Sequence, residues 1–337
     1  MKKLLLIHGI FLSIFLLYLY DYHFRESSSS PLSQEEEGLR GEISEKYVMV
    51  TFQAGIDYWK MPLKGFEDAA HALNVSVEYR GAAQYDVHEQ ITVLEQVIAK
   101  KPAGIAISAI NPDKLTPTIN KAIDAGIPVI LFDADAPSSR GDAFVGTNNY
   151  NAGLTAAHKM ADLLGSKGKV AIVTLPNQLN HQERTKGFLE TITKEYPEME
   201  IVAIKDGKGD QLFSRQMVVD ILREHPDLAG IFATESNGGV GIANAVQSVK
   251  THKKIKIISF DTDKRTLDMV KEGTISATLA QGTWKMGYWS LQFLFHLNHK
   301  LNPSSEEGVS DATLLPPYMD TGITVVTKEN VENYYAK

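Results

Sequence analysis

The sequence predicts an α/β protein with two Rossmann-like, three-layer domains in tandem, and three observations lead to this fold class. The stretch from Gly104 to Pro137 holds two short apolar runs, Gly104–Ile107 and Pro128–Phe132, with a helical segment between them. Strand, crossover helix and strand in about 30 residues form a βαβ unit with parallel strands. The same alternation continues on both sides of this unit. It restarts at Tyr150 with a second set of similar length, which indicates two similar domains.

The first domain is expected to alternate strands and helices from Tyr47 onward. Tyr47–Phe52 is a continuous apolar run, typical of a strand buried on both faces of a parallel sheet. The crossover helix carries Leu115, Ile119, Ala122 and Ile123, spaced to cover one face. The predicted strands are residues 47–52, 75–79, 104–107, 128–132 and 143–145, and the other predicted helices are residues 62–73 and 87–99.

The second domain repeats this pattern. Its predicted helices are residues 150–164, 181–195, 211–224 and 239–249, and its predicted strands are residues 169–174, 200–204, 230–233, 255–260 and 275–280. The helix 284–297 and the segment 322–326 follow this set, and each must join one of the two sheets.

Composition excludes several function classes. The chain has 337 residues, 43% hydrophobic and 22% charged, enough for two cores of ordinary domain size. A net charge of −7 argues against a nucleic-acid partner, whose phosphates require clustered Lys and Arg. The chain has no cysteine, which excludes disulfides, thiol catalysis, thiolate metal sites and a lipid-anchored cysteine.

The N-terminus predicts a membrane anchor. Two lysines precede an apolar run, Leu4–Tyr20, whose length is at the lower limit for a span and long for a signal-peptide core. No A-x-A-like cleavage site follows it, so we expect residues 1–24 to be an uncleaved signal anchor, with a cleaved peptide as the alternative. The lysines keep the N-terminus in the cytoplasm and place the folded part outside the cell membrane, extracellular or periplasmic. Residues 25–46, rich in Ser, Glu and Gly, predict a flexible tether.

Catalytic and cofactor motifs are missing from the sequence. It contains no G-x-S-x-G elbow and no Walker lysine loop. The segment Asn237–Gly241 follows a strand and opens a helix, but Asn244 stands where a dinucleotide loop has its third glycine. Asp206–Asp210 favours a turn over a calcium loop, and the pair His296 and His299 favours a surface position over a metal site. We therefore expect no metal, no cofactor and no enzyme, although a sugar-converting α/β enzyme remains an alternative.

Polar and aromatic side chains recur where strands end in both halves, and this set suits a sugar. Carboxylates, amides and an arginine form charge-assisted hydrogen bonds with hydroxyls, which both donate and accept. Aromatic rings pack against the apolar face of a sugar ring. The residues are Tyr58, Trp59, Ser108, Asp133, Asp135, Asn149, Arg184, Glu235, Ser236, Asp261 and Gln281.

At these positions the chain resembles the ribose-binding-protein-like periplasmic sugar-binding proteins, which share their core with LacI-type repressors. The resemblance runs from Tyr47 to about Val326, and the order and spacing of its motifs fit together. The motifs are Asp57–Trp59, Ser108, Gly126–Asp133, Val145–Asn149, Glu183–Phe188, Ile258–Asp261 and Thr278–Gln281.

The resemblance implies a periplasmic binding protein of type I, in which a three-strand hinge joins two lobes that close on one sugar. Residues 47–147 plus 282–316 would form the first lobe, and residues 148–281 plus 317–337 the second. A membrane segment in place of a helix-turn-helix excludes the repressors as a functional class.

The resemblance also implies roles for single residues. Tyr58 and Trp59 would sandwich or edge the sugar ring, and Gln281 would lie at the hinge. Hydroxyls would bond Ser108 and Asp133 in the first lobe and Arg184 and Asp261 in the second.

The chain departs from ribose binders at two positions, where it has Glu235–Ser236 in place of Asn-Asp and Ala134 in place of arginine. These departures favour another monosaccharide.

We therefore expect an extracytoplasmic monosaccharide-binding protein that signals to a membrane partner such as a histidine kinase. The substrate-binding component of a sugar ABC transporter, with an ABC permease as its partner, is the alternative. The predicted anchor favours sensing because transport receptors of this family in Gram-positive bacteria are usually held by a lipidated cysteine. The sequence leaves the identity of the sugar open.

Overall fold

The computed structural model describes residues 39–249, 254–301 and 315–335. The chain divides into residues 1–40 and one compact unit, Gly41–Lys337, which holds every element named below. Within the described ranges no helix is both long and apolar enough to span a bilayer. The predicted anchor, residues 1–24, lies outside the described residues, as does most of the predicted tether.

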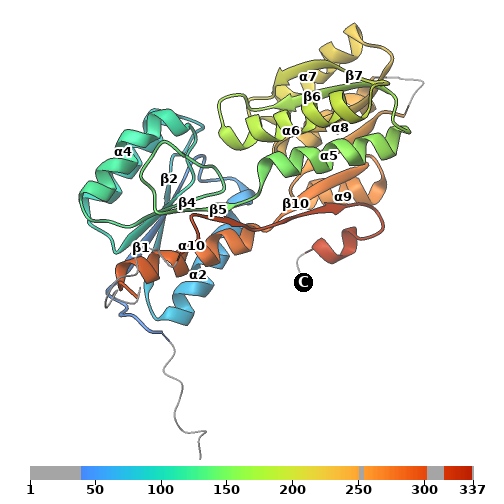
Figure 1. Cartoon of the computed structure of the whole chain (residues 1–337). Helices are drawn as coiled ribbons and strands as arrows, with labels where there is room; N and C mark the ends of the chain where they lie inside the picture. Colours follow the sequence, from blue (N-terminus) through green and yellow to red (C-terminus); the bar gives the residue numbers. More distant parts are fainter. Residues whose placement is uncertain (1–38, 250–253, 302–314, 336–337) are drawn as a thin grey trace, which may run out of the picture. The chain divides into compact units, whose positions relative to one another are not determined.

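Two six-stranded sheets confirm the predicted fold class (Figure 1). The first sheet is entirely parallel, in the order β11-β5-β4-β3-β1-β2. Its strands are β1 (Lys46–Thr51), β2 (Ser76–Gly81), β3 (Gly104–Ile107), β4 (Val129–Phe132), β5 (Ala143–Gly146) and β11 (Tyr318–Asp320).

The second sheet repeats this order as β12-β10-β9-β8-β6-β7, and only its edge strand β12 is antiparallel. Its strands are β6 (Gly168–Thr174), β7 (Met199–Asp206), β8 (Leu228–Ala233), β9 (Lys256–Phe260), β10 (Ala277–Gln281) and β12 (Ile323–Val326).

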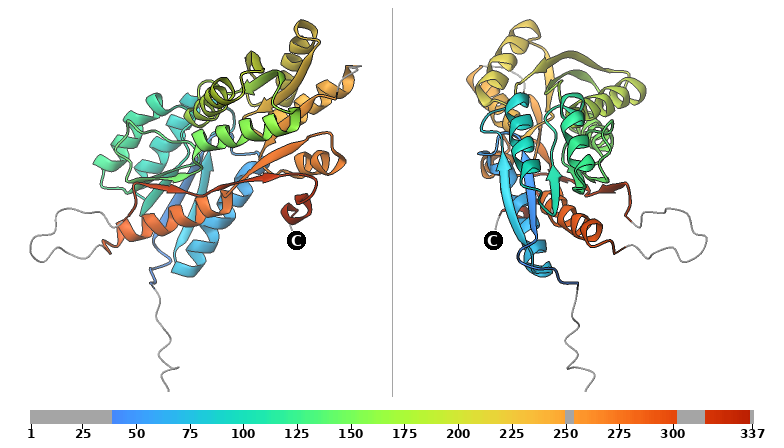
Figure 2. Two further views of the ribbon diagram at one scale, coloured as in Figure 1. Left: turned by 45° about the vertical axis from the view of Figure 1, so that its right-hand side comes forward. Right: turned by 90° about the vertical axis from the view of Figure 1, so that its left-hand side faces the viewer.

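Helices cover both faces of each sheet, which gives the three layers (Figure 2). In the second lobe, alternate strand residues such as Ala171 and Ile172 enter separate apolar cores on the two faces. The first lobe has η1 (Asp57–Trp59), α2 (Lys60–Leu73), α3 (Val87–Ala99), α4 (Pro112–Asp124) and α10 (Thr283–Asn298). The second has α5 (Asn149–Leu164), α6 (Leu179–Glu195), α7 (Gln211–Glu224), α8 (Ser236–Ser248), α9 (Lys264–Glu272) and η2 (Val331–Tyr334).

Glycines let one pair of helices in each lobe pack backbone to backbone. A Cβ atom at Gly287 of α10 would lie 1.8 Å from the carbonyl oxygen of Pro62 in α2. A Cβ atom at Gly153 of α5 would lie 2.0 Å from the carbonyl oxygen of Arg184 in α6. Because α5 and α10 each begin where the chain has just changed lobes, these crossings fix the helices that follow the hinge.

The structure corrects the predicted boundary of the second lobe. Residues 317–337 were assigned to that lobe, but β11 pairs with β5 in the first sheet. The amide of Phe144 donates to the carbonyl oxygen of Pro317, which extends this pairing. The third change of lobe therefore falls between Asp320 and Ile323, while the other two fall between β5 and α5 and between β10 and α10.

The last residues of the predicted tether are folded. Gly41 donates its amide to the carbonyl oxygen of Leu73, and Lys46 begins β1. Oε2 of Glu45 lies 2.7 Å from Nε2 of His299, so this histidine, predicted to lie at the surface, has a carboxylate partner from a distant segment. Residues 41–46 thus belong to the first lobe, because polar contacts to α2 and α10 hold them there.

Candidate functional site

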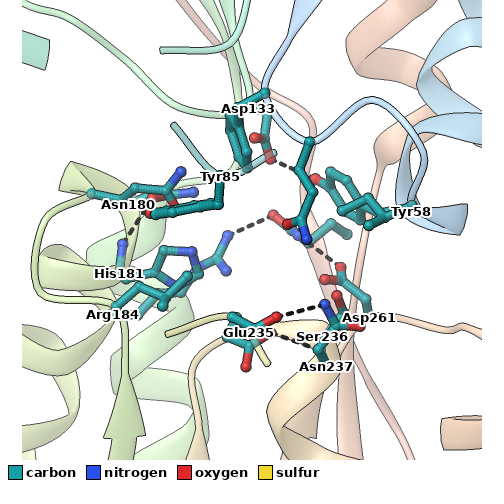
Figure 3. Close-up of a pocket in the computed structure, with 17 residues that line it drawn as sticks. Tyr58, Tyr85, Asp133, Asn180, His181, Arg184, Glu235, Ser236, Asn237 and Asp261 are labelled. Atoms are coloured by element: carbon teal, nitrogen blue, oxygen red, sulfur yellow. Dashed lines mark hydrogen bonds between the residues drawn. The ribbon is translucent and has the colours of Figure 1, made fainter. Parts of the chain in front are cut away.

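Side chains from both lobes line a cleft with about 470 Å³ of empty space, part of it open to solvent (Figure 3). The cleft lies at the carboxyl ends of parallel strands, where open α/β sheets bind their ligands. It is lined by Phe52, Gln53, Ile56, Tyr58, Tyr85, Asp133, Leu175, Gln178, Asn180, His181, Arg184, Gly209, Glu235, Ser236, Asn237, Asp261 and Gln281.

Two aspartates in left-handed backbone conformation enter the cleft from opposite lobes. Asp133 follows β4 with φ of 60°, and Asp261 follows β9 with φ of 66°. Their amides donate to the carbonyl oxygens of Val145 and Leu279 in the neighbouring strands. Aspartate tolerates this conformation better than most residues do, so each strand can end sharply and leave a carboxylate at the cleft.

Both carboxylate oxygens of Asp133 have partners. The hydroxyl of Tyr58 donates to Oδ1 at 2.5 Å, and that of Ser108 donates to Oδ2 at 2.8 Å. Burial raises the pKa of Asp133, while these two hydrogen bonds oppose the shift. A carboxylate held by two hydroxyls in the ligand-free protein can exchange one of them for a hydroxyl of a ligand.

Arg184 of α6 is only 2% exposed and is held in a fixed orientation. Its Nε donates to Oδ1 of Asn149 at 2.9 Å, Nη1 to the Thr234 carbonyl oxygen at 2.8 Å, and Nη2 to Oε1 of Gln281 at 2.8 Å. Its guanidinium carbon lies 3.8 Å above the centre of the Phe260 ring. A guanidinium has five N–H groups, so these three bonds leave two for a ligand.

Gln281 connects the two lobes. Its Nε2 donates to Oδ1 of Asp261 at 2.7 Å and lies 3.4 Å from the hydroxyl of Tyr58. Its Oε1 also accepts from Oγ1 of Thr147 at 2.8 Å. The side chain at the end of β10 therefore links both aspartates and the arginine into one network.

Burial controls the charges around this network. It raises the pKa of both Glu235 and Asp261 to about 7, while Arg184 opposes the shift in each case. Burial also lowers the pKa of His181 well below its usual value. Nδ1 of this neutral imidazole lies 3.0 Å from the Thr234 carbonyl oxygen, an acceptor, so Nδ1 carries the proton and Nε2 is an acceptor.

Seven of the sequence-predicted site residues line the cleft: Tyr58, Asp133, Arg184, Glu235, Ser236, Asp261 and Gln281. Two others lie directly behind it. Ser108 is buried and donates to Asp133, and Asn149 accepts from Arg184, so both act on the cleft through a charged neighbour.

Trp59 does not line the cleft, which corrects its predicted contact with a sugar ring. It is 2% exposed, its indole N–H donates to the Phe52 carbonyl oxygen at 2.9 Å, and its ring packs edge-on against Tyr58 and Phe132. Tyr58 and Trp59 are neighbours in η1, and the side chain of Trp59 points into the core of the first lobe. Of the two, only Tyr58 lines the cleft.

Asp135 lies in a separate hollow of about 610 Å³ beside the first change of lobe. Asn149, Glu183 and Tyr318 line the same hollow. Burial raises the pKa of Asp135, whose carboxylate accepts from the amide of Ala136. Only one residue, Ala134, separates Asp133 from Asp135, yet the backbone turn after β4 directs them to different surfaces.

Several residues line the cleft that the sequence did not predict as site residues: Phe52, Tyr85, Gln178, Asn180, His181 and Asn237. For some of them the sequence does offer a signal, a position in the loop between a strand and the next helix. Tyr85 follows β2, and Gln178 and Asn180 follow β6. The predicted set contains the polar residues closest to each strand end, and these three lie a few positions further along.

Two expectations about motifs receive a structural explanation. Gly239 and Gly241 in α8 would clash with Ser259 and with the backbone of Gln211 if they carried a Cβ atom, so these glycines serve helix packing. Asp210 caps α7 through the amides of Leu212 and Phe213, which makes Asp206–Asp210 a turn. Among the described residues no cluster of three or more His, Asp or Glu side chains is arranged to hold a metal ion.

Comparison with known proteins agrees with this architecture. Residues 47–300 match the family of the periplasmic binding protein domain. An arabinose-binding protein, AraP from Geobacillus stearothermophilus, is 67% identical with a TM-score of 0.76, over 87% of this chain and 99% of that chain. A sugar-binding protein of a sugar ABC transporter from Bacillus halodurans is 64% identical with a TM-score of 0.78, over 86% of this chain and 100% of that chain.

A third similar structure is the XylFII–LytSN complex. It is 26% identical with a TM-score of 0.75, over 84% of this chain and 98% of that chain. The matched family model spans most of the folded unit, and the two lobes have the architecture of these solved structures. The chain belongs to the family of the periplasmic binding protein domain.

Proposed function

We propose that this protein binds a monosaccharide, arabinose or a closely similar pentose, in the cleft between its lobes. The observation that carries the proposal is the network of Asp133, Asp261, Arg184 and Gln281 beside the ring of Tyr58. Carboxylates accept from sugar hydroxyls, the guanidinium donates to them, and an aromatic ring packs on the apolar face of the sugar. The arabinose-binding protein that shares 67% identity supports arabinose as the sugar.

The cleft gives sugar binding a mechanism. Asp133 and Tyr58 belong to the first lobe and Arg184 and Asp261 to the second, so a sugar that contacts both sets favours the closed arrangement. A ligand shifts such an equilibrium only by its difference in affinity for the two arrangements. Hydroxyls that contact both lobes at once provide this difference.

We also propose that the sugar is bound without chemical conversion. The cleft presents carboxylates, amides, an arginine and a neutral histidine. The sequence contains neither a G-x-S-x-G elbow nor a Walker lysine loop. Recovery of unchanged arabinose after long incubation with the protein is the expected result. Appearance of an isomer or a cleavage product would support the enzyme alternative.

The membrane partner is proposed to be a sensor histidine kinase, with the folded part outside the cytoplasmic membrane and the predicted anchor, residues 1–24, in it. The similar XylFII–LytSN structure, in which a protein of this fold is in complex with another protein, supports a protein partner. The second candidate is an ABC permease, which the similar protein from Bacillus halodurans supports.

Deletion of the gene separates these two roles. A strain without a sensor should lose transcription of arabinose genes on addition of arabinose, but should still take up labelled arabinose when those genes are expressed from an unrelated promoter. Loss of uptake under that artificial expression would instead identify a transport component.

Calorimetric titration tests the sugar itself. L-arabinose and D-arabinose are compared with ribose, xylose, glucose and galactose. At 100 times its Kd a ligand also stabilises the protein by about 2.7 kcal/mol, so a thermal shift provides a second readout. Absence of binding and of a thermal shift with both arabinoses would contradict the proposal.

A further inference from the structure

Gln178 has a fully buried side chain that forms no hydrogen bond with any described residue. Its exposed fraction is 0%, and both the amide nitrogen and the amide oxygen lack partners. The residue also lines the cleft. A buried amide without hydrogen-bond partners has lost its contacts with water and gained none in the protein, which is unfavourable. Such a side chain at the wall of a binding cleft is arranged for a polar ligand.

Helix capping does not explain the position of this side chain. Gln178 precedes α6, but its side chain accepts no hydrogen bond from the helix. At the corresponding positions of α3 and α7, the side chains of Asp86 and Asp210 do cap the helix. The side chain of Gln178 therefore does not make the capping hydrogen bond that its position before α6 allows.

Tyr85 brings a further unpartnered polar atom to the same cleft from the other lobe. Its hydroxyl oxygen is buried without a hydrogen-bond partner among the described residues, and Figure 3 shows its ring pointing into the cleft. The ring packs edge-on against Phe52, at 5.7 Å between ring centres. Burial raises its pKa, so the hydroxyl is neutral and can both donate and accept.

The two side chains lie at one end of the cleft. Tyr85 and Leu175 together line both the cleft and an adjoining hollow, and the backbone N–H of Gln178 donates to the carbonyl oxygen of Leu175. Another adjoining hollow shares Tyr58, Asp261 and Gln281 with the cleft and contains neither Gln178 nor Tyr85. The charged network and the unpartnered pair thus lie at different parts of the cleft.

We propose that Gln178 and Tyr85 form a specificity subsite that recognises one hydroxyl of the sugar. This inference rests on the proposed function. A neutral hydroxyl fits because the amide and the phenol each both donate and accept, and neither carries charge. A sugar that lacks or misplaces this hydroxyl leaves the amide buried and unpaired, and a site of this kind rejects such a ligand strongly. Gln178 and Tyr85 therefore set which sugar is accepted, while the charged network supplies general affinity.

The test compares arabinose with its monodeoxy analogues, each lacking one hydroxyl, by calorimetric titration of the purified protein. One variant is Gln178→Met, which keeps the length of the side chain and removes its polar atoms, and the other is Tyr85→Phe. Matched controls are Gln216→Met, on the exposed face of α7, and Tyr196→Phe, whose hydroxyl bonds His158 at the C-terminal end of α6. Thermal unfolding checks that each variant is folded.

The expected result is that one analogue binds wild-type protein at least about tenfold more weakly than arabinose. In Gln178→Met and in Tyr85→Phe, the ratio of the Kd for that analogue to the Kd for arabinose should fall toward one. Both control variants should keep the wild-type ratio. Ratios that match wild type within about threefold in both variants would overturn the subsite and leave the proposed function standing. Failure of the wild-type protein to bind any sugar would remove the proposed function itself, and the subsite with it. If Gln178→Met does not fold, Tyr85→Phe decides by the same criterion.

Discussion

Asp133 and Asp261 hold corresponding positions in the two lobes. Each follows the fourth strand of its lobe in the chain, each has positive φ, and each donates its amide to the next strand. Tyr58 contacts Asp133 and Gln281 contacts Asp261, while Nε2 of Gln281 lies 3.4 Å from the Tyr58 hydroxyl. The repeated architecture therefore brings two carboxylates to one cleft, one from each lobe.

Asp133→Asn and Asp261→Asn should each weaken arabinose binding by about tenfold to a hundredfold, because a hydrogen bond to a charged group contributes about 1.5–3 kcal/mol. Asparagine tolerates the left-handed backbone, so both variants should keep the fold. Asp133→Ala should also lower the unfolding temperature, since alanine is strained at a φ of 60°. Calorimetry and thermal unfolding measure both effects. Asp162→Asn, on the exposed face of α5, is the control. An arabinose affinity equal to that of the control in both Asp133→Asn and Asp261→Asn would contradict the assignment.

Stability of the ligand-free protein should fall as pH rises from 5 to 8. Glu235 and Asp261 have pKa values of about 7 in the folded protein, whereas carboxyl groups of an unfolded chain lose their protons near pH 4. Between these values the two carboxyls hold more protons in the folded state, so the free energy of unfolding decreases with pH and levels off above pH 7. The lowered pKa of His181 opposes this decrease below pH 6.5, but by one proton against two.

Thermal unfolding across this range measures the pH effect. Asp261→Asn should flatten the decrease, because asparagine carries no proton to lose, while Asp162→Asn should keep the wild-type slope. Stability that rises steadily from pH 5 to 8, or a slope that Asp261→Asn leaves unchanged, would show that the buried carboxyls do not govern it.

Gly153→Ala and Gly287→Ala should both destabilise the fold, since each added methyl group would overlap a backbone carbonyl of the facing helix. Overpacking of this kind costs on the order of 1–3 kcal/mol or more. Gly153→Ala should additionally weaken sugar binding, because the displaced carbonyl belongs to Arg184. Gly55→Ala, with open space around its Cβ position, is the neutral control. Unfolding temperatures equal to that of the control would be inconsistent with the close helix crossings.

Trp59→Phe and Tyr58→Phe should have opposite signatures. Trp59→Phe loses a buried hydrogen bond to Phe52, so it should lower the free energy of unfolding by about 1 kcal/mol or more and change the Kd for arabinose less than threefold. Tyr58→Phe removes the donor to Asp133 and should weaken binding more than it lowers stability. Calorimetry and denaturant titration of both variants measure the contrast, and a large loss of affinity in Trp59→Phe alone would restore its predicted contact with the sugar.

Periodicity in the sequence was sufficient to predict most of the fold. Continuous apolar runs such as Tyr47–Phe52 and Gly104–Ile107 mark strands buried between two helical layers, and these strands appear where expected. Helix α9 was not predicted, because Leu267, Met269 and Val270 are its only large apolar residues and charged side chains surround them. Strand β11 has three residues and is recognisable only from its pairing with β5.

The candidate site was predicted less completely, for a geometric reason. Residues directly after a strand, such as Asp133 and Asp261, have their direction fixed by the strand and its turn. Tyr85 and Gln178 lie further along their loops, where the path of the chain depends on contacts that the sequence does not show. Trp59 and Asp135 were predicted to bind sugar because they belong to the aromatic and polar residues near strand ends. Each lies only one or two positions from a residue that lines the cleft, but its side chain points elsewhere.

Small-angle scattering with and without arabinose tests the central claim most directly, since it reports whether a sugar closes the two lobes. A variant that lacks residues 1–40, which lie outside the compact unit, is suited to this measurement. We predict a smaller radius of gyration at saturating arabinose, and no such change in Arg184→Ala, which loses the link between α6 and Gln281. A scattering profile that is unchanged in the wild-type protein when calorimetry shows saturation would contradict closure of the lobes on the sugar.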